Sequence, residues 1–585
     1  MIRKLVRQML TAQILSALTV SLCLLIDSIM IARFMGEQAI AAYGLANPLL
    51  LAIGALGSLL AAGIQTACSR SLGRGDQEET NAGFSSAVAV SAGISVLFMA
   101  AALLFRSPLA RIMGAGKSGE LFEQTRDYLA GFSIGAPGSL GALVLVPFMQ
   151  LAGQSGLLIA AVLGMTVTDV ALDLLNALVF HGGMFGMGLA SALSYYAAMG
   201  ISAFYFLSKK SVFRFSPRQV TRRKAGELFV SGIPAGFNMA SSVILVFLMN
   251  RITQSSGGQA AVAAFTVIMT IGNSACCITT GIGGVSLTLS GILYNEEDRS
   301  GLKELIRLMI RYSGALGAAM GAVLVIFAPA FVSLFIPAAG STQDMAVTGL
   351  RIFAAGLIPC CMNNALKYTY QGCGRPKLTE TISLLEGAAL PAAAAFVMSR
   401  AAGLTGAWLY FPAGELMTLG GIALWIRRKT KQKPWEEGAC LLLTSEFGVS
   451  PDRLLETDLH SMEEVTAAAR EAERFCRSHG ESERVSNRIA LCIEEMASNT
   501  IRHGFEKDRK EHHLSVRVLC KPDHWVLRFR DDRGAFDPVH YVPEEPEKAL
   551  GIRLTRAIAL EAKYTYSLNL NNLTLKLPRD RADGG

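Results

Sequence analysis

The segment SGLLIAAVLGMTVTDVALDLLNALVF (155–180) decides the fold class. Its only charged side chains are Asp169 and Asp173, and a helix of about 20 apolar residues is enough to cross a bilayer. Comparable apolar runs recur along the chain. They predict about twelve membrane-spanning helices, near 9–33, 44–68, 83–105, 127–149, 155–180, 186–208, 227–250, 260–292, 312–336, 346–370, 378–399 and 404–426.

Charge separates these spans from a second part of the chain. Residues 1–434 hold 32 of the 54 Lys and Arg and 19 of the 46 Asp and Glu, so their net charge is +13. Residues 435–585 hold the other 22 and 27, for a net charge of −5. The whole chain is only 17% charged, against about 25% in soluble proteins, which excludes an ordinary soluble enzyme. We predict a membrane domain followed by a soluble one.

Basic residues in the loops predict the orientation. If the N-terminus lies inside, the inner loops hold 23 Lys and Arg and the outer loops hold 7. Cytoplasmic loops carry the excess of positive charge, so both termini and the soluble domain are predicted to be cytoplasmic. No nucleic-acid partner is expected, because the basic residues cluster at the inner membrane flanks and the soluble part is acidic.

The membrane part reads as two repeats. IAAY (40–43) resembles VAAF (262–265), and QLAG (150–153) resembles QGCG (371–374), at offsets of 222 and 221 residues. Such a shared offset indicates a duplication into two parallel halves with a substrate cavity between them. The predicted domains are two six-helix bundles (1–208 and 226–428), a basic loop (209–225), a linker (429–455) and a soluble domain (456–578).

Polar residues inside the spans are the candidate functional residues, because a charge in hydrocarbon is costly. Asp27 lies in the first predicted span, and Asp169, Asp173 and Asn176 share one face of the fifth. Neighbouring carboxylates disfavour double ionisation, so one of them can take up and release a proton, and with amide and hydroxyl oxygens they can also hold Na⁺. In the second half, Lys367, Glu386 and Glu415 are candidates for burial, with Lys367 and Glu386 as a possible structural pair.

Several separated motifs resemble the multidrug and toxin extrusion (MATE) transporters: DSIMIARFMGEQAIAAYGLANPL (27–49), SLGRGDQEE (71–79), QLAGQSG (150–156), LDLLNALVFHGGMFGMGLASAL (172–193) and YQGCGRP (370–376). The resemblance implies two six-helix bundles in the membrane that rock between inward- and outward-open states. It also implies export of organic, often cationic compounds, driven by entry of Na⁺ or H⁺. Asp27, Asp169 and Asp173 match the family's cation-site positions, although many members carry Asn in the fifth-helix pair. Two alternatives stay open, a lipid-precursor flippase and a membrane-anchored sensor.

The soluble part predicts an α+β sandwich. Residues 459–480 and 484–504 read as helices, and HHLSVRVLCKPDHWVLRFRDD (512–532) alternates as two strands around a KPD turn. Residues 548–562 read as a further helix, and KYTYSLNLNNLTLKL (563–577) as a hairpin that turns at Asn571 and Asn572.

Three clusters in this part point to nucleotide chemistry. Glu495, Asn499 and His503 recur every four residues on one helix face, and a carboxylate and an amide there suit a general base and a Mg²⁺ ligand. The strand end FRDDRGAFDP (529–538) offers an acid for adenine, and KALGIRL (548–554) places Gly551 near a helix start, where backbone N–H groups meet phosphates.

Together these clusters resemble the GHKL ATPase fold, in particular the anti-sigma-factor serine kinases of bacteria. The resemblance implies Mg-ATP as cofactor and an anti-sigma-antagonist-like protein as a partner, and it places the chain in a bacterial inner membrane. It implies Glu495 as general base and Asn499 as Mg²⁺ ligand, with His503, Asp531, Gly534, Phe536 and Gly551 in the nucleotide site.

Two departures from that family pattern matter. Arg533 takes a usual Gly position, so Asp532 is an alternative adenine acid, and Ala549 replaces a second loop Gly. The chain has no GxxxxGK[ST] segment, so we expect ions, not ATP, to drive transport, with the soluble domain in a regulatory or kinase-like role.

Overall fold

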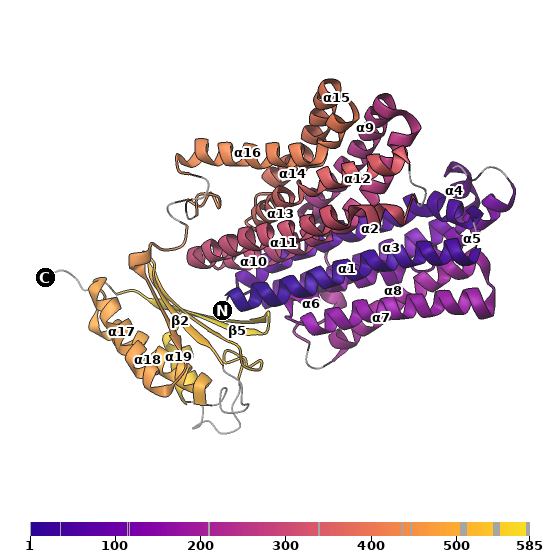
Figure 1. Ribbon diagram of the computed structural model, residues 1–585. Helices are drawn as coiled ribbons and strands as arrows, with labels where there is room; N and C mark the ends of the chain where they lie inside the picture. Colours follow the sequence, from indigo (N-terminus) through magenta and orange to yellow (C-terminus); the bar gives the residue numbers. More distant parts are fainter. Residues whose placement is uncertain are drawn as a thin grey trace.

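The computed structural model describes residues 2–580 except 36, 114, 116–117, 209–210, 337–339, 434–435, 437, 445–446, 503–511 and 542–549. Two bundles of long helices stand side by side, and a smaller domain of strands and helices lies against one end of them (Figure 1). We call that end of the bundles the domain-facing end and the opposite end the far end. The first helix begins at the domain-facing end.

The first bundle contains α1 (Ile2–Met35), α2 (Glu37–Gly73), α3 (Gln77–Leu104), α4 (Arg106–Ile112), α5 (Glu120–Ser133), α6 (Ala136–Leu151), α7 (Ser155–Leu175), the π-helical η1 (Asn176–Phe180) and α8 (Gly183–Leu207). After the short η2 (Pro217–Gln219), the second bundle contains α9 (Arg222–Ala275), α10 (Cys277–Asn295), α11 (Arg299–Ser333), α12 (Ser341–Ala354), α13 (Leu357–Gly372), α14 (Pro376–Leu384), the π-helical η3 (Leu385–Ala389), α15 (Leu390–Trp408) and α16 (Tyr410–Thr430). Positive φ angles at Gly258 (67°) and Gly403 (59°) break α9 and α15.

Most of the predicted spans are helices of the required length and apolarity. Among the described residues seven helices satisfy both conditions, and nine do so if the bent pairs α5–α6 and α12–α13 each count as one span. The predicted spans near 9–33, 227–250 and 404–426 are also helical, in α1, α9 and α16, but are not among these nine.

Matching turns support the duplication. Asp76 caps α3 by accepting a hydrogen bond from the Glu79 N–H (2.8 Å), and Asp298, 222 residues later, caps α11 by accepting one from the Gly301 N–H (2.8 Å). Gly153 and Gly374, 221 residues apart, both end helices with left-handed φ angles of 74° and 75°. The two halves thus share backbone geometry at the offsets that the sequence indicates.

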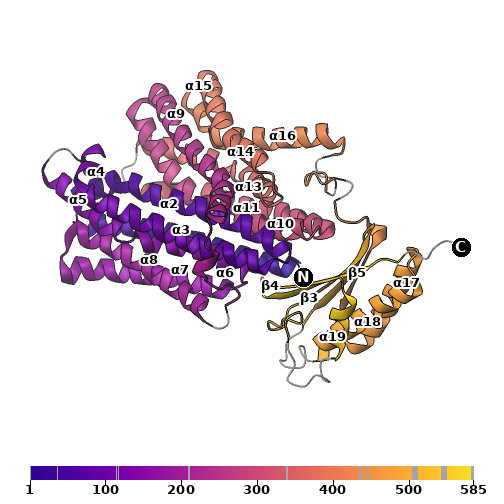
Figure 2. The same ribbon diagram turned by 180° about the vertical axis from the view of Figure 1, so that it is seen from behind.

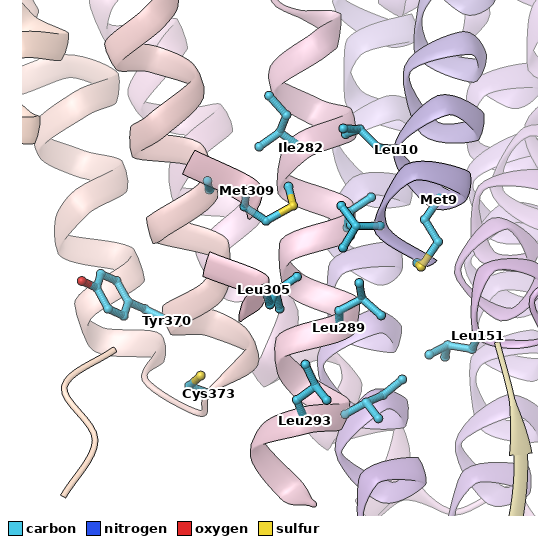
Figure 3. Close-up of a cluster of buried hydrophobic side chains, with 14 of the residues drawn as sticks. Met9, Leu10, Leu151, Ile282, Leu289, Leu293, Leu305, Met309, Tyr370 and Cys373 are labelled. Atoms are coloured by element: carbon cyan, nitrogen blue, oxygen red, sulfur yellow. The ribbon is translucent and has the colours of Figure 1, made fainter. Parts of the chain in front are cut away.

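The bundles join at the domain-facing end and separate at the far end. One cluster of buried apolar side chains spans both halves at the domain-facing end, with Met9, Leu10 and Leu151 from the first bundle and Ile282 and Leu289 from the second (Figure 3). Toward the far end the described core residues form two distinct clusters, one within each bundle. The helices therefore diverge like a V that opens at the far end (Figure 1).

Close helix contact holds the joined end together. A Cβ atom on Gly73 would lie 2.5 Å from the Ile292 carbonyl oxygen, so only glycine lets α2 approach α10 this closely. Arg70 Nη2 donates a hydrogen bond to the Gln371 carbonyl (3.2 Å), and Gln371 Nε2 donates to Thr66 Oγ1 (3.1 Å). Both halves contribute to this closure.

The smaller domain contains a five-stranded antiparallel sheet in the order β1-β2-β3-β5-β4. The strands are β1 (Leu454–Leu459), β2 (Leu514–Cys520), β3 (His524–Asp531), β4 (Glu561–Ser567) and β5 (Leu570–Pro578). Helices α17 (Met462–Ser478), α18 (Glu483–Thr500) and α19 (Leu550–Ile558) cover one face (Figure 2). Alternate residues of β3, Trp525, Leu527 and Phe529, pack into the core beneath these helices.

The opposite face of the sheet contacts both bundles. Arg517 and Arg530 form ion pairs with Asp298 and Glu296 of the α10–α11 turn, and Lys521 pairs with Glu297. On the first bundle, the tip between β4 and β5 binds the α6–α7 turn: the Leu568 N–H donates to the Leu151 carbonyl (2.8 Å) and Asn569 Nδ2 donates to the Gly153 carbonyl (2.9 Å).

The predicted linker packs on the second bundle. Tyr370 Oη donates to the Cys440 carbonyl (2.8 Å), Arg375 Nη1 donates to the Leu441 carbonyl (3.1 Å), and Phe447 stacks on Tyr294 with ring centres 4.8 Å apart. The tether that remains between Phe447 and β1 is only a few residues long.

Two sequence predictions need correction. The β4–β5 turn lies at Leu568 and Asn569, whose φ angles are 58° and 60°, and not at Asn571 and Asn572, which pair with β3. The last helix ends at Ile558, because β4 already begins at Glu561. Strand β1 was not predicted, since its sequence LLETDL lacks strict alternation.

Candidate functional site

Three buried carboxyl groups lie together in the first bundle. Asp27 on α1 is 6% exposed, and Asp169 and Asp173 on α7 are 2% and 1% exposed. Helix α1 packs on α7, and the Asp27 carboxyl interacts with both acids and shares a hydrogen bond with that of Asp169. Both carboxyl oxygens of Asp173 are buried and accept no hydrogen bond from the described residues. A proton or a cation would satisfy these oxygens.

Asn176 lies where α7 continues into η1. Its Nδ2 donates to the Gly183 carbonyl (3.1 Å), and its Oδ1 accepts from the Gly182 N–H (3.1 Å). Both ends of the amide therefore hold the turn between η1 and α8. Short π-helical segments within α-helices frequently mark functional sites, and this one follows the two acids of α7 directly.

The second bundle holds a different polar cluster. Lys367, Glu386 and Glu415 are 1%, 8% and 3% exposed. Lys367 Nζ lies 3.2 Å from Glu386 Oε1, which makes the ion pair that the sequence suggested. Asn363 Nδ2 donates to Glu415 Oε2 (2.7 Å). Cys360 Sγ and one oxygen of each glutamate lie within 4.8 Å of one another. The cluster joins α13, η3 and α16.

The predicted general base and the phosphate-loop glycine are neighbours in the smaller domain. Glu495 and Asn499 lie one turn apart on α18 and are half-buried. A Cβ atom on Gly551 of α19 would lie 1.8 Å from Glu495 Oε2, so a side chain at 551 would displace this carboxylate. His503 and Ala549 lie outside the described residues.

The structure separates the two acids at the end of β3. Asp531 is 3% exposed and lies on the helix-covered face of the sheet, as Trp525 and Phe529 do. Burial raises the pKa of the Asp531 carboxyl, although Arg533 and Asn571 oppose the shift. Asp532 instead accepts hydrogen bonds from the His513 N–H (2.9 Å) and pairs with Lys4 of α1 (3.4 Å).

The environment of Asp532 keeps it ionised. Burial alone would raise the pKa of this carboxyl, but hydrogen bonds from His513 and His512 and the charge of Lys4 hold it below its usual range. Of the two acids, Asp531 therefore has the better position to meet a base between the sheet and its helices.

Asn571 organises the loop after β3, and the sequence analysis missed this role. Its Nδ2 donates to Asp531 Oδ1 (2.8 Å) and lies 3.2 Å from the Gly534 carbonyl, while its Oδ1 accepts from the Phe536 N–H (3.0 Å). Strand alternation is the signal that could have shown it, because it places the Asn571 side chain on the inward face of β5, opposite Asp531. Arg533 Nε also lies 3.2 Å from Asp531 Oδ1, so a guanidinium occupies one side of the predicted adenine acid.

Comparison with known proteins agrees with this division of the chain. The MatE family model matches residues 12–175 and 234–387, more than half of the chain, and a model described as a histidine kinase-like ATPase domain matches residues 460–577. A relative described as probable multidrug resistance protein NorM, from Photorhabdus laumondii, is 25% identical over 226 residues. The match covers 37% of this chain and spans about half (49%) of that relative.

Solved structures share the fold of the bundles. A MATE crystal structure in complex with MaL6 has a TM-score of 0.68 and 21% identity, over 74% of this chain and 96% of that one. An outward-facing multidrug resistance MATE transporter gives 0.67 and 20%, and a MOP superfamily transporter from Pyrococcus furiosus gives 0.66 and 21%, with the same coverage. The chain thus belongs to the MatE family, and it carries a histidine kinase-like ATPase domain at its C-terminal end.

Proposed function

We propose that the chain exports small organic cations by alternating access, driven by entry of Na⁺ or H⁺. The observation that carries this proposal is the group of three buried carboxyls, Asp27, Asp169 and Asp173. Three neighbouring carboxyls away from water cannot all stay ionised, so this group favours binding a proton or a metal cation. Asn176 keeps the end of α7 in place beside them.

Export of the substrate is coupled to ion entry if the ion and the substrate each bind the inward-open and outward-open states with different affinities. The far-end opening corresponds to the outer side in this proposal, and the domain-facing end to the cytoplasm of a bacterium, where the basic loops also lie. Acidic rather than basic side chains in the first bundle favour an exporter of cations over a flippase of anionic lipid precursors.

The test is transport of a fluorescent organic cation such as ethidium in proteoliposomes, with Na⁺ and H⁺ gradients imposed separately. Asp27→Asn and Asp173→Asn should reduce gradient-driven transport to the level of empty liposomes. Asp344→Asn, at an exposed site near the start of α12, removes the same charge and should leave transport unchanged. Undiminished transport in both first-bundle variants would refute the proposal, and transport by the parent under neither gradient would favour the sensor alternative.

We further propose that the C-terminal domain binds Mg-ATP and regulates the transporter. Glu495 acts as general base, Asn499 as Mg²⁺ ligand and Asp531 as the adenine acceptor, with Gly551 against the phosphates. Magnesium would neutralise phosphate charge when bound. The close packing of Gly551 on Glu495 supports this site. The Arg533–Asp531 ion pair is expected to weaken nucleotide binding there, because it occupies the adenine acceptor.

Thermal unfolding of the full-length protein in nanodiscs tests the nucleotide site. Mg-ATP should raise the midpoint of the parent, and Asn499→Ala should abolish that shift. Arg533→Gly should strengthen ATP binding, because it frees Asp531 from its guanidinium partner. No ATP-dependent shift in either the parent or Arg533→Gly would refute nucleotide binding. Transfer of labelled phosphate to a serine of an anti-sigma-antagonist-like protein would extend the role to a kinase.

A further inference from the structure

A cavity of about 500 Å³ lies between the sheet and the joined ends of the two bundles. Three parts of the chain form its walls. The α2–α3 turn of the first bundle contributes Leu72 to Gly75, the α10–α11 turn of the second contributes Asn295 to Glu297, and strands β3, β4 and β5 contribute their outward-facing side chains. Its volume falls in the range of small-molecule sites, about 300–1,000 Å³.

Positive charge exceeds negative charge among the described residues that line this cavity: five are Lys or Arg (Arg74, Lys521, Arg528, Lys563, Lys576) and three are Asp or Glu (Glu296, Glu297, Asp523). Lys563 and Lys576 both pair with the single carboxylate of Glu561 (2.8 and 2.5 Å). Each of these lysines keeps about 40% of its side chain exposed to the cavity and its rim. Among the described residues the two lysines share this one carboxylate, which balances only one of their two positive charges.

Arg528 is the strongest evidence for a ligand. It lies at the middle of β3, opposite Arg517 of β2 and Thr574 of β5. The nearby acids of the α10–α11 turn already pair with Arg517, Arg530 and Lys521. Arg528 Nε is buried and has no hydrogen-bond partner among the described residues, and the side chain lines the cavity. A buried charged donor without a partner is unfavourable, so a ligand that accepts a hydrogen bond from it would be stabilised.

The geometry points to a second ligand site on this protein: we propose that the cavity binds a small soluble phosphate ester or polyphosphate. The Arg528 guanidinium anchors a phosphate group through paired N–H donors, which match phosphate oxygens in shape and charge. Lys576 and Lys563 neutralise further phosphate charge, and the Thr574 hydroxyl and Asn572 amide line the same wall.

This site is distinct from the proposed ATP site. Alternate residues of a strand point to opposite faces, so Arg528 faces the bundles while Asp531 faces the helices. The cavity walls are the sheet and the turns at the bundle ends, not the outer faces of the helices. A soluble anion therefore fits this position better than the headgroup of a bilayer lipid.

Binding of this ligand would also depend on the conformation of the two bundles. Because the walls come from both bundles and from the sheet, the full site exists only when the bundle ends are together. By linkage, the ligand then favours that state over one in which these ends separate. This consequence rests on the proposed alternating access, whereas the binding site itself does not.

Isothermal titration of the full-length protein with inorganic pyrophosphate, in phosphatidylcholine nanodiscs, tests the site. Arg528→Gln should weaken binding about ten-fold or more, the loss expected for a charged hydrogen bond. Lys576→Gln, at a partly exposed position, should weaken it about three-fold. Arg470→Gln on the exposed side of α17 removes the same charge outside the cavity and should leave affinity within two-fold.

The remaining arms separate other sources of binding. Asn499→Ala should leave pyrophosphate affinity unchanged, and loss of binding in this variant would assign the anion to the ATP site and overturn the proposal. Equal affinity in the parent, Arg528→Gln and Lys576→Gln would overturn it as well. So would the absence of pyrophosphate binding in phosphatidylcholine together with Arg528-dependent binding of phosphatidylglycerol, which would make the ligand a lipid headgroup.

Discussion

Replacing Asp298 by Asn is expected to loosen the contact between the ATPase-like domain and the second bundle. Asp298 is 4% exposed, forms an ion pair with Arg517 and caps α11 through the Gly301 N–H. Asparagine is also a good helix cap, so Asp298→Asn keeps the cap and removes the charge. The variant therefore isolates the electrostatic part of docking.

The pKa of Asp298 gives the magnitude. Burial alone would raise it, but Arg517 and Arg530 lower it from 3.8 to about 2. Both guanidiniums belong to the docked domain, so most of this shift disappears when the domain leaves. One pKa unit corresponds to 1.36 kcal/mol, so the docked state gains roughly 2 kcal/mol, or about 30-fold in the docking equilibrium.

The pH dependence follows from the sign of this shift. The carboxyl is ionised in the docked state down to about pH 2, whereas a free aspartate takes up its proton near pH 3.8. The contribution is therefore complete above pH 3.8 and is lost as the pH falls toward 2. At neutral pH, Asp298→Asn should show the whole effect.

Electron paramagnetic resonance distances between spin labels at two exposed positions, Arg218 and Arg470, provide the assay. The parent should give one narrow distance, and Asp298→Asn should add a broad undocked population. Asp76→Asn is the matched control, because Asp76 caps α3 in the corresponding turn of the first half and forms no ion pair with the sheet among the described contacts. Identical distance distributions in the parent and Asp298→Asn would refute the reasoning.

Three further substitutions have expected outcomes. Glu386→Gln leaves the Lys367 ammonium buried without its ion partner, and we expect a loss of about 3–5 kcal/mol in unfolding free energy; an unmoved denaturation midpoint would contradict this. Asn571→Ala removes the four hydrogen bonds to Asp531 at the end of β3 and to Arg533, Gly534 and Phe536 in the loop after it, and should raise hydrogen exchange in residues 531–537, with unchanged exchange as the opposing result. Gly551→Ala should abolish the ATP-dependent thermal shift by displacing the predicted general base, whereas Gly226→Ala near the start of α9, where no atom lies within 4 Å of the added carbon, should retain it.

The sequence predicted well which site residues share one helix, but which helices bring their residues together was predicted only by resemblance to a family. Asp169 and Asp173 share a helix face because of their i, i+4 spacing, and this needs no tertiary information. That Asp27 meets them depends on the packing of α1 on α7, which local periodicity does not contain. The duplication was visible as an offset because both halves repeat the same turns.

The errors have physical causes. Asn-Asn reads as a turn, yet Asn571 is buried on β5 because its amide meets Asp531, a contact 40 residues away in sequence. Strand alternation predicts that Arg517, Arg528 and Arg530 share a face but not what covers it. Arginines on a sheet face normally face solvent, but here the docked bundles cover them: Arg517 and Arg530 pair with the α10–α11 turn, and Arg528 lines the cavity.

The packed linker keeps the ATPase-like domain close to its docking surface on the bundles. Phe447 stacks on Tyr294, and β1 begins at Leu454, so six residues connect the packed linker to the domain and would tether it after undocking. A short tether of this kind gives an effective concentration in the millimolar range. A domain that undocks therefore returns before it meets any rival present at micromolar levels. The same domain supplied on a separate chain at micromolar concentration should therefore fail to displace it.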